Sequence, residues 1–314
     1  MSSELQVRAA KREWYERWFK DPVIGILAIF LWGLFRVLPL DVASWFGGWL
    51  GRVFSVFLPS KNKVALFNLK RCFPEKTDAE RKKILSGMWQ HLGRMIGEIP
   101  HGRKMEKRIQ IKGKEYVEEA KKLGKGGFLA SGHVGNWELI GPVLMSMGTP
   151  LHLVYRAANN PWIERFIFSR RRVKGIHLIP KGTAGARLMI ELLRNKEYIG
   201  ILCDQKLREG IDVPFFGYPA KTAPAIATLS LKYDLSIIPI LVSREKGAHY
   251  TCYFSKIMDL PNSGDKTADT YQLMLSINKM LEGWIQEHPE QWLWIHHRWN
   301  KEEYSEQSEK NLDA

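Results

Sequence analysis

Short apolar runs alternate with longer amphipathic segments from Gly126 onward, and this alternation constrains the fold more than any other feature. The short runs, which are typical of buried strands, cover residues 126–131, 150–156, 176–180, 198–204, 235–243 and 249–256. Helical patterns lie between or after them, over residues 138–147, 162–172, 184–195, 222–233 and 267–288. Strands and helices that alternate in this way build a mostly parallel sheet flanked by helices. The sequence therefore predicts an α/β fold with its active site at the carboxyl ends of the strands.

The N-terminal part of the chain carries a separate apolar signal. Residues 23–40 form an apolar run that only Arg36 interrupts. At 1.5 Å per residue this run reaches roughly 27 Å, barely the thickness of a bilayer core. Basic and aromatic side chains precede the run, and a second apolar stretch continues up to Pro59. We expect a membrane anchor helix followed by an interfacial helix or a shallow hairpin; the alternative is a pair of core helices, which the charge of Arg36 favours.

The rest of the chain divides into a large domain and a short tail. From Lys61 to about Lys125 the pattern is helical, polar and basic, and residues 78–99 form its clearest amphipathic segment. We expect an N-terminal anchor over residues 1–59, a globular domain over residues 60–300 and a frayed polar tail over residues 301–314.

Composition narrows the class of partner. The formal net charge is +14, from 47 Lys and Arg against 33 Asp and Glu, which indicates an anionic partner. Nucleic acid, a membrane surface and a phosphate-rich substrate all satisfy that charge, but the chain shows no nucleic-acid-binding module. The three cysteines are far apart in the sequence, which fits neither a disulfide framework nor a zinc site. Their spacing therefore favours a reducing compartment.

A histidine and a glutamate follow the first predicted strand. His133 lies in the turn after the strand, and Glu138 lies in the first turn of the next predicted helix. From there Glu138 can reach back to one ring nitrogen of His133, which holds one tautomer and leaves the other nitrogen to take a proton from a hydroxyl. Gly132 and Gly135 let the backbone bend between them. For the pattern H-x-x-x-x-E alone, a turn histidine beside an unrelated glutamate is the commoner situation.

Further polar side chains lie at predicted carboxyl ends of strands or after the next helix. Arg156 ends the strand over residues 150–156, where its guanidinium can grip a phosphate through two hydrogen bonds. Arg170 and Arg171 belong to a basic cluster after the following helix, for which a solvated helix end is the alternative. Asp204 and Gln205 follow the strand that starts at Tyr198. Asp204 can order either the basic cluster or the acceptor, and a loop-capping role is the alternative.

The order of these motifs resembles the lysophospholipid acyltransferase-like superfamily and, more closely, the late acyltransferases of lipid A biosynthesis. The motifs are H-x-x-x-W-E from His133, Tyr155-Arg156 before Asn160-Pro161, Asp204-Gln205, Val213 to Gly217, Ile238-Pro239, and the closing segment 289–299. The resemblance runs from about Pro22 to Asn300. Glycerolipid relatives usually have Asp where Glu138 stands, and many relatives have Pro where this chain has Ala157-Ala158.

The resemblance implies a membrane-anchored acyltransferase on the cytoplasmic side of a bacterial inner membrane. The implied donor is laurate or myristate on acyl carrier protein, and the implied acceptor is a hydroxyl of a 3-hydroxyacyl chain on an anionic lipid A precursor. Among these enzymes the resemblance favours the last-acting myristoyl or lauroyl transferase. The implied reaction needs neither a metal ion nor a cofactor. The alternative is a glycerophospholipid or glycolipid acyltransferase that uses acyl-CoA. The implied site residues are His133 and Glu138 for catalysis and Arg156, Arg170, Arg171, Asp204 and Gln205 for substrate binding.

Overall fold

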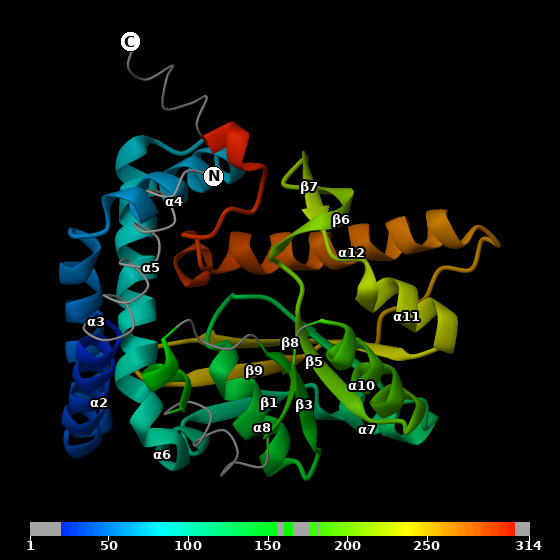
Figure 1. Ribbon diagram of the computed structural model, residues 1–314, viewed down its shortest axis with the longest axis horizontal. Helices are drawn as coiled ribbons and strands as arrows, with labels where there is room; N and C mark the ends of the chain where they lie inside the picture. Colours follow the sequence, from blue (N-terminus) through cyan, green and yellow to red (C-terminus); the bar gives the residue numbers. More distant parts are fainter. Residues whose placement is uncertain (1–19, 156–159, 166–175, 181, 305–314) are drawn as a thin grey trace, which may run out of the picture.

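A seven-stranded sheet forms the centre of the computed structural model, which describes residues 20–155, 160–165, 176–180 and 182–304 (Figure 1). The strand order is β1-β9-β8-β2-β5-β3-β4, and every neighbouring pair is parallel except β8 and β9. The strands are β1 (Ile109–Lys112), β2 (Gly127–Ser131), β3 (Leu151–Tyr155), β4 (Ile176–Pro180), β5 (Tyr198–Leu202), β8 (Ser236–Arg244) and β9 (Tyr250–Phe254). The predicted α/β fold with a mostly parallel sheet is confirmed, and all six predicted strands are present.

Helices cover both faces of this sheet. The helices of the described residues are α2 (Asp21–Val37), α3 (Leu40–Ser55), α4 (Pro59–Cys72), α5 (Asp78–Glu98), α6 (Gly102–Glu106), α7 (Lys114–Leu123), α8 (Ile140–Ser146), α10 (Thr183–Arg194), α11 (Ala225–Tyr233) and α12 (Lys266–Glu287), with 3₁₀ turns η2 (Ile99–His101), η3 (Trp137–Leu139) and η4 (Pro289–Gln291). All of β2 is buried: Phe128 and Ala130 lie in a core with α11 and α12, and Leu129 lies in a second core with α7 and α8. Burial on both faces explains why these strands are continuous apolar runs rather than alternating ones.

Three strands, β1, β6 (Lys206–Phe215) and β7 (Tyr218–Thr222), were not predicted from the sequence. The edge strand β1 interrupts a region that reads as wholly helical. A separate antiparallel pair, β6 and β7, follows β5 directly. Phe216 and Gly217 connect this pair with φ angles of 50° and 79°, as a tight hairpin turn requires. Thus the segment Val213 to Gly217, singled out in the sequence, closes a hairpin.

The N-terminal helices pack on α5. Gly47 of α3 faces Gly93 of α5 so closely that a Cβ atom at Gly47 would lie 2.4 Å from the Gly93 carbonyl oxygen. Pro39 divides the apolar stretch into α2, with 17 residues, and α3, with 16. In the part of the chain that the structure describes, no helix has the length and apolar character needed to cross a bilayer, so the predicted spanning helix is not confirmed.

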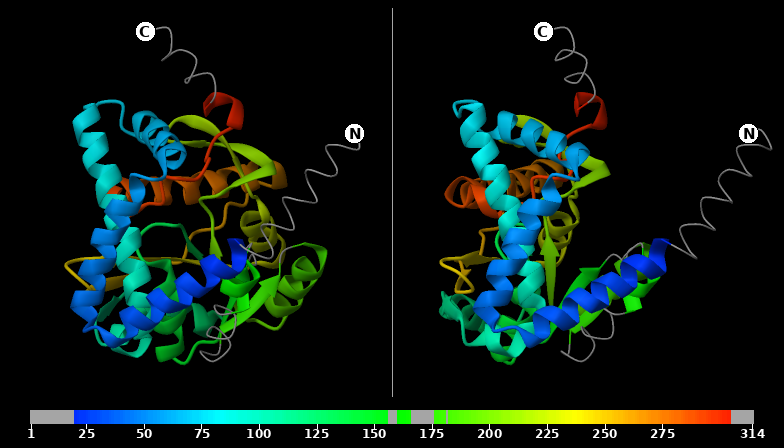
Figure 2. Two further views of the ribbon diagram at one scale, coloured as in Figure 1. Left: turned by 60° about the vertical axis from the view of Figure 1, so that its left-hand side comes forward. Right: turned by 90° about the vertical axis from the view of Figure 1, so that its left-hand side faces the viewer.

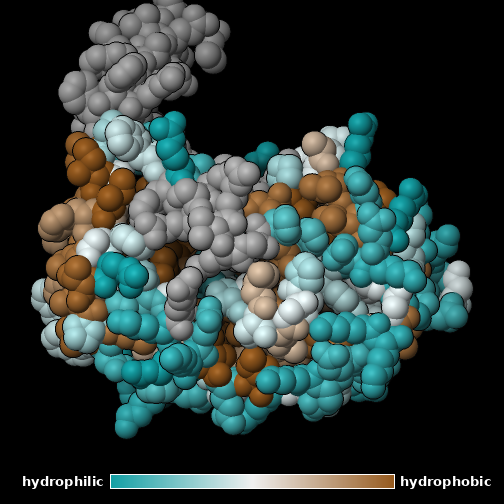
Figure 3. Space-filling view, turned by 90° about the horizontal axis from the view of Figure 1, so that it is seen from below, coloured by the Kyte–Doolittle hydropathy of each residue, from teal (hydrophilic) through white to brown (hydrophobic). Residues whose placement is uncertain are grey.

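The outer surface of α2 and α3 is nonetheless strongly apolar. Figure 2 shows α2, in dark blue, on the outside of the molecule, and Figure 3 shows apolar side chains gathered on that side, at its left edge. The large exposed side chains are Val23, Ile24, Ile26, Leu27, Ile29, Phe30, Val37, Val42, Trp45, Trp49, Val53 and Phe54. We call this set the α2–α3 apolar surface. Within α2 only Gly25 and Phe35 are buried, so α2 is not a core helix.

Candidate active site

The carboxyl ends of two neighbouring strands bring His133 and Asp204 together. Strand β2 pairs with β5 so that Ser131 lies opposite Leu202, and His133 and Asp204 each follow two residues later. The ring Nδ1 of His133 lies 2.8 Å from Oδ1 of Asp204. The main-chain N–H of His133 donates to Oδ2 of the same carboxylate at 2.9 Å. The sheet register therefore fixes this pair, as expected for a site at the carboxyl ends of parallel strands.

Asp204 is fully buried and ionised. Its Oδ2 also accepts a hydrogen bond from Nε1 of Trp292 at 2.8 Å. Burial alone would raise the pKa of Asp204, but the charge and hydrogen bond of His133, together with His296 and Trp292, lower it well below the ordinary value. A carboxylate held in this way stabilises positive charge on the imidazole beside it.

The orientation of His133 leaves one ring nitrogen for chemistry. An ionised carboxylate can only accept hydrogen bonds, so Nδ1 of His133 carries the proton that it donates to Asp204. Nε2 is then the basic nitrogen, and the side-chain amide nitrogen of Gln205 lies 3.4 Å from it. The His133 side chain is 14% exposed, whereas Asp204 is not exposed at all. The pair can therefore act as a general base, with Nε2 of the partly exposed His133 as the nitrogen that takes the proton.

The backbone after His133 makes a turn that needs glycine. Gly135 has a φ angle of +65°, and a Cβ atom there would lie 2.1 Å from the carbonyl oxygen of Val242. The Gly135 N–H donates to the carbonyl of Gln291 at 3.0 Å, and the Asn136 N–H donates to that of Val242 at 2.8 Å. These two N–H groups hold the turn against the sheet and the C-terminal segment.

Glu138 lies at the start of the helical segment that follows His133, as predicted. It lies in η3, is exposed, and lines a small cavity of about 50 Å³ together with Glu98 and Asn136. We expected Glu138 to hold one nitrogen of His133, but at Nδ1 that contact belongs to Asp204. The physical reason is that β5 lies next to β2 in the sheet, a strand order that the sequence does not reveal. A catalytic role for Glu138 stays a prediction.

The remaining predicted site residues divide into two groups. Gln205 lies beside the basic nitrogen of His133 and is exposed, a position open to substrate. Arg156, Arg170 and Arg171 lie outside the described residues, so their role in substrate binding stays a prediction. Sequence reasoning missed Trp292, which belongs to the closing segment 289–299 and whose only signal was that segment's place among the motifs.

Comparison with known proteins decides which reaction this geometry serves. The family described as bacterial lipid A biosynthesis acyltransferase matches residues 16–301, nearly the whole chain. The chain belongs to this family. It is an acyltransferase of lipid A, and therefore of lipopolysaccharide, biosynthesis, and the resemblance found in its motifs is confirmed.

Characterised relatives are similar along most of the chain. The lipid A biosynthesis palmitoleoyltransferase of Escherichia coli (strain K12) is 27% identical over 296 residues, covering 90% of this acyltransferase and 92% of the relative. The lauroyltransferase of the same strain is 26% identical and covers 83% and 86% of the two chains. The myristoyltransferase of that strain is 25% identical and covers 78% and 77%. These relatives are named for different acyl chains, so similarity alone does not select one.

Proposed function

We propose that this acyltransferase moves a fatty acyl chain of the laurate or myristate class from acyl carrier protein to the hydroxyl of a 3-hydroxyacyl chain on a lipid A precursor. The observation that carries the proposal is the buried contact between Asp204 and Nδ1 of His133, which leaves Nε2 of His133 as the base. An acyl thioester needs only a deprotonated hydroxyl to attack its carbonyl carbon.

The reaction proceeds in two proton-coupled steps. Nε2 of His133 takes the proton of the acceptor hydroxyl while that oxygen attacks the thioester carbonyl and forms a tetrahedral intermediate. Asp204 stabilises the imidazolium that results. The intermediate then collapses, the carbon–sulfur bond breaks, and the imidazolium returns its proton to the departing sulfur. The products are the ester on the lipid and the free thiol of the carrier.

The charge of the chain suits both substrates in this proposal. A lipid A precursor carries phosphates on a disaccharide, and acyl carrier protein is acidic, whereas this chain has a net charge of +14. Among the basic side chains we assign Arg156, Arg170 and Arg171 to the phosphates of the acceptor, because guanidinium groups bind phosphate through paired hydrogen bonds. The reaction itself calls for neither a metal ion nor a cofactor.

We propose further that the α2–α3 apolar surface lies in the headgroup layer of the inner membrane, on its cytoplasmic side. Trp45 is 60% exposed and Trp49 49% exposed, and indole rings favour the boundary between water and lipid. An exposed apolar surface on a helix pair is a common way to lie on a bilayer without crossing it. The lipid acceptor would then reach His133 from the membrane in which it is dissolved.

Mass spectrometry of lipid A tests the proposal. A strain that lacks this gene should make lipid A short of one acyl chain, and the wild-type gene should restore the mass while His133→Ala should not. Transfer by the purified protein should then be measured with acyl carrier protein and with coenzyme A thioesters side by side. Unchanged lipid A together with altered phospholipid species would instead favour the glycerophospholipid alternative.

A further inference from the structure

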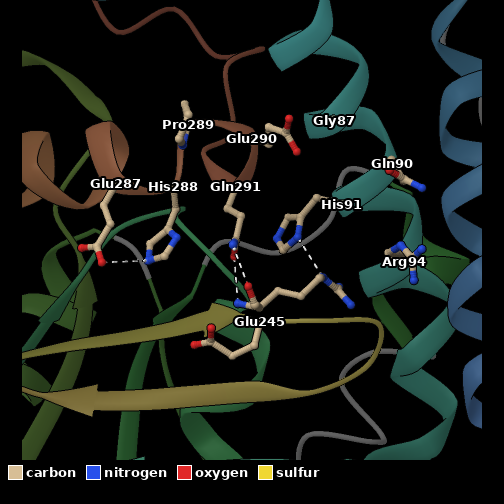
Figure 4. Close-up of a pocket in the computed structure, with 11 residues that line it drawn as sticks. Gly87, Gln90, His91, Arg94, Glu245, Glu287, His288, Pro289, Glu290 and Gln291 are labelled. Atoms are coloured by element: carbon tan, nitrogen blue, oxygen red, sulfur yellow. Dashed lines mark hydrogen bonds and ion pairs between the residues drawn. The ribbon is translucent and has the colours of Figure 1, made fainter.

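A polar cavity lies directly behind the turn that carries His133. It has a volume of about 360 Å³, and α5, η4 and the end of β8 line it (Figure 4). His91 of α5 and Arg244 of β8 belong to this lining, together with Gln291. None of the three has a part in the acyl-transfer mechanism above, yet all of them contact the catalytic turn or each other.

His91 joins the turn to Arg244. Its Nε2 lies 3.1 Å from the carbonyl oxygen of Gly135, and its Nδ1 lies 3.1 Å from Nε of Arg244. Nε of a guanidinium always carries hydrogen, so Nδ1 of His91 accepts and Nε2 donates to Gly135. Burial and the charge of Arg244 lower the pKa of His91 to about 3, which keeps this ring neutral at ordinary pH.

Arg244 is anchored in turn by Glu98, which is 2% exposed. Both terminal nitrogens of Arg244 contact the Glu98 carboxylate, at 2.5 and 3.2 Å. The same carboxylate accepts hydrogen bonds from Ser44 of α3 at 2.7 Å and from the Tyr250 hydroxyl at 2.5 Å. Tyr250 accepts from the side-chain amide of Asn136 at 3.1 Å. Two branches therefore run from Glu98, one to Gly135 and one to Asn136.

We propose that His91, Arg244, Glu98 and Tyr250 form a positioning relay that holds the Gly135–Asn136 turn and so aims Nε2 of His133 at the acceptor hydroxyl. The proposal rests on the proposed function only in taking His133 as the base. The relay touches no reacting group. Because Ser44 belongs to α3, it also ties the turn to the helix that carries Trp45 and Trp49.

The test begins with His91→Leu, which leaves the Gly135 carbonyl and Nε of Arg244 without partners. Misplacement of a catalytic group by about 1 Å costs roughly a hundredfold, so kcat should fall about tenfold to a hundredfold. The KM values for acyl carrier protein thioester and for lipid A precursor should stay within about twofold, because the relay contacts neither substrate. His91→Gln presents an N–H and an oxygen in similar places and should recover most of kcat.

Two further variants keep the test sharp. Gln90→Leu is the matched control: Gln90 is next to His91 and lines the same cavity, but its oxygen accepts from exposed Arg52, so its kcat should equal wild type. Tyr250→Phe breaks only the branch to Asn136 and should lower kcat less than His91→Leu. It serves also if His91→Leu fails to fold.

A readout without substrate separates this proposal from the proposed function. Hydrogen exchange of the Gly135 and Asn136 N–H groups should speed up about tenfold or more in His91→Leu and stay unchanged in Gln90→Leu. That result, with no transfer by the wild-type protein, would refute the proposed function and leave the relay standing. Wild-type kcat and unchanged exchange in His91→Leu, or equal losses in His91→Leu and His91→Gln, would overturn the relay.

Discussion

The carboxyl edge of the sheet buries a charged side chain, whereas the outer surface of α2 and α3 exposes apolar side chains. At the sheet edge Asp204 is an ionised carboxylate with no exposed area, paired with His133 and Trp292. On the outer surface Val23, Phe30 and Trp45 are 64%, 65% and 60% exposed. Buried charge is costly unless it is fully paired, and exposed apolar area is costly unless something covers it. The difference separates the region to which we assign proton transfer from the region that we propose meets lipid.

The largest effect should come from removing the base. His133→Ala should lower acyl transfer by about 10² to 10⁴, because general-base assistance has that magnitude. Single-turnover transfer to the lipid A precursor measures it, with circular dichroism confirming the fold. A His133→Ala variant that folds and turns over at nearly the wild-type rate would show that the carboxyl edge of the sheet does not supply the base.

Phosphate recognition should give the next largest effect. Lysine keeps the charge of arginine but loses the planar pair of donors, so Arg156→Lys and Arg171→Lys should raise the KM for the acceptor about tenfold. The KM for the donor should stay nearly constant. Arg187→Lys, at an exposed position on α10, is the control and should change neither constant. A rise in donor KM instead would assign these arginines to the acyl carrier.

The proposed contact of the α2–α3 apolar surface with lipid can be tested by removing its exposed tryptophans. Burial of about 100 Å² of a tryptophan contributes roughly 2.5 kcal/mol, so Trp45→Ser and Trp49→Ser should each weaken vesicle binding by about tenfold or more. Co-sedimentation with phospholipid vesicles measures this loss. Leu123→Ser removes an equally exposed apolar side chain from α7 and should leave binding unchanged. Equal losses at all three positions would mean that the α2–α3 apolar surface has no special role.

The last effect concerns acid stability and is absent at neutral pH. Burial lowers the pKa of His91 to about 3 and that of His296 to about 4, from an ordinary value of 6.5. Below pH 6.5 the unfolded chain therefore binds protons that the folded chain does not, and each histidine removes about 1.4 kcal/mol of unfolding free energy per pH unit. For His296 this loss ends near pH 4, and for His91 near pH 3. His91→Gln should flatten the slope measured by urea unfolding by one such amount; an unchanged slope would contradict the neutral, buried ring.

The sequence allowed most of the fold to be predicted but only part of the site. Strands buried on both faces leave continuous apolar runs, so β2 and β5 could be found, whereas β1 and the hairpin β6–β7 carry polar residues and could not. His133 could be found because the turn after a strand is marked by glycines on both sides. Its partner Asp204 could not be assigned, because the contact depends on β5 lying beside β2 in the sheet. Trp292 reaches the same carboxylate from the C-terminal segment, a contact that no local pattern reveals.

The most direct test of the account is the rate of single-turnover acyl transfer by Asp204→Asn. Asparagine has nearly the same shape but no charge, so it can neither fix the Nδ1–H tautomer of His133 nor stabilise the imidazolium. We predict a loss of at least about a hundredfold, with the acceptor KM nearly unchanged. Asp212→Asn, which breaks only the exposed ion pair with Lys221, should transfer at the wild-type rate. Transfer by folded Asp204→Asn within about threefold of wild type would contradict the account and return the role of the acid to Glu138.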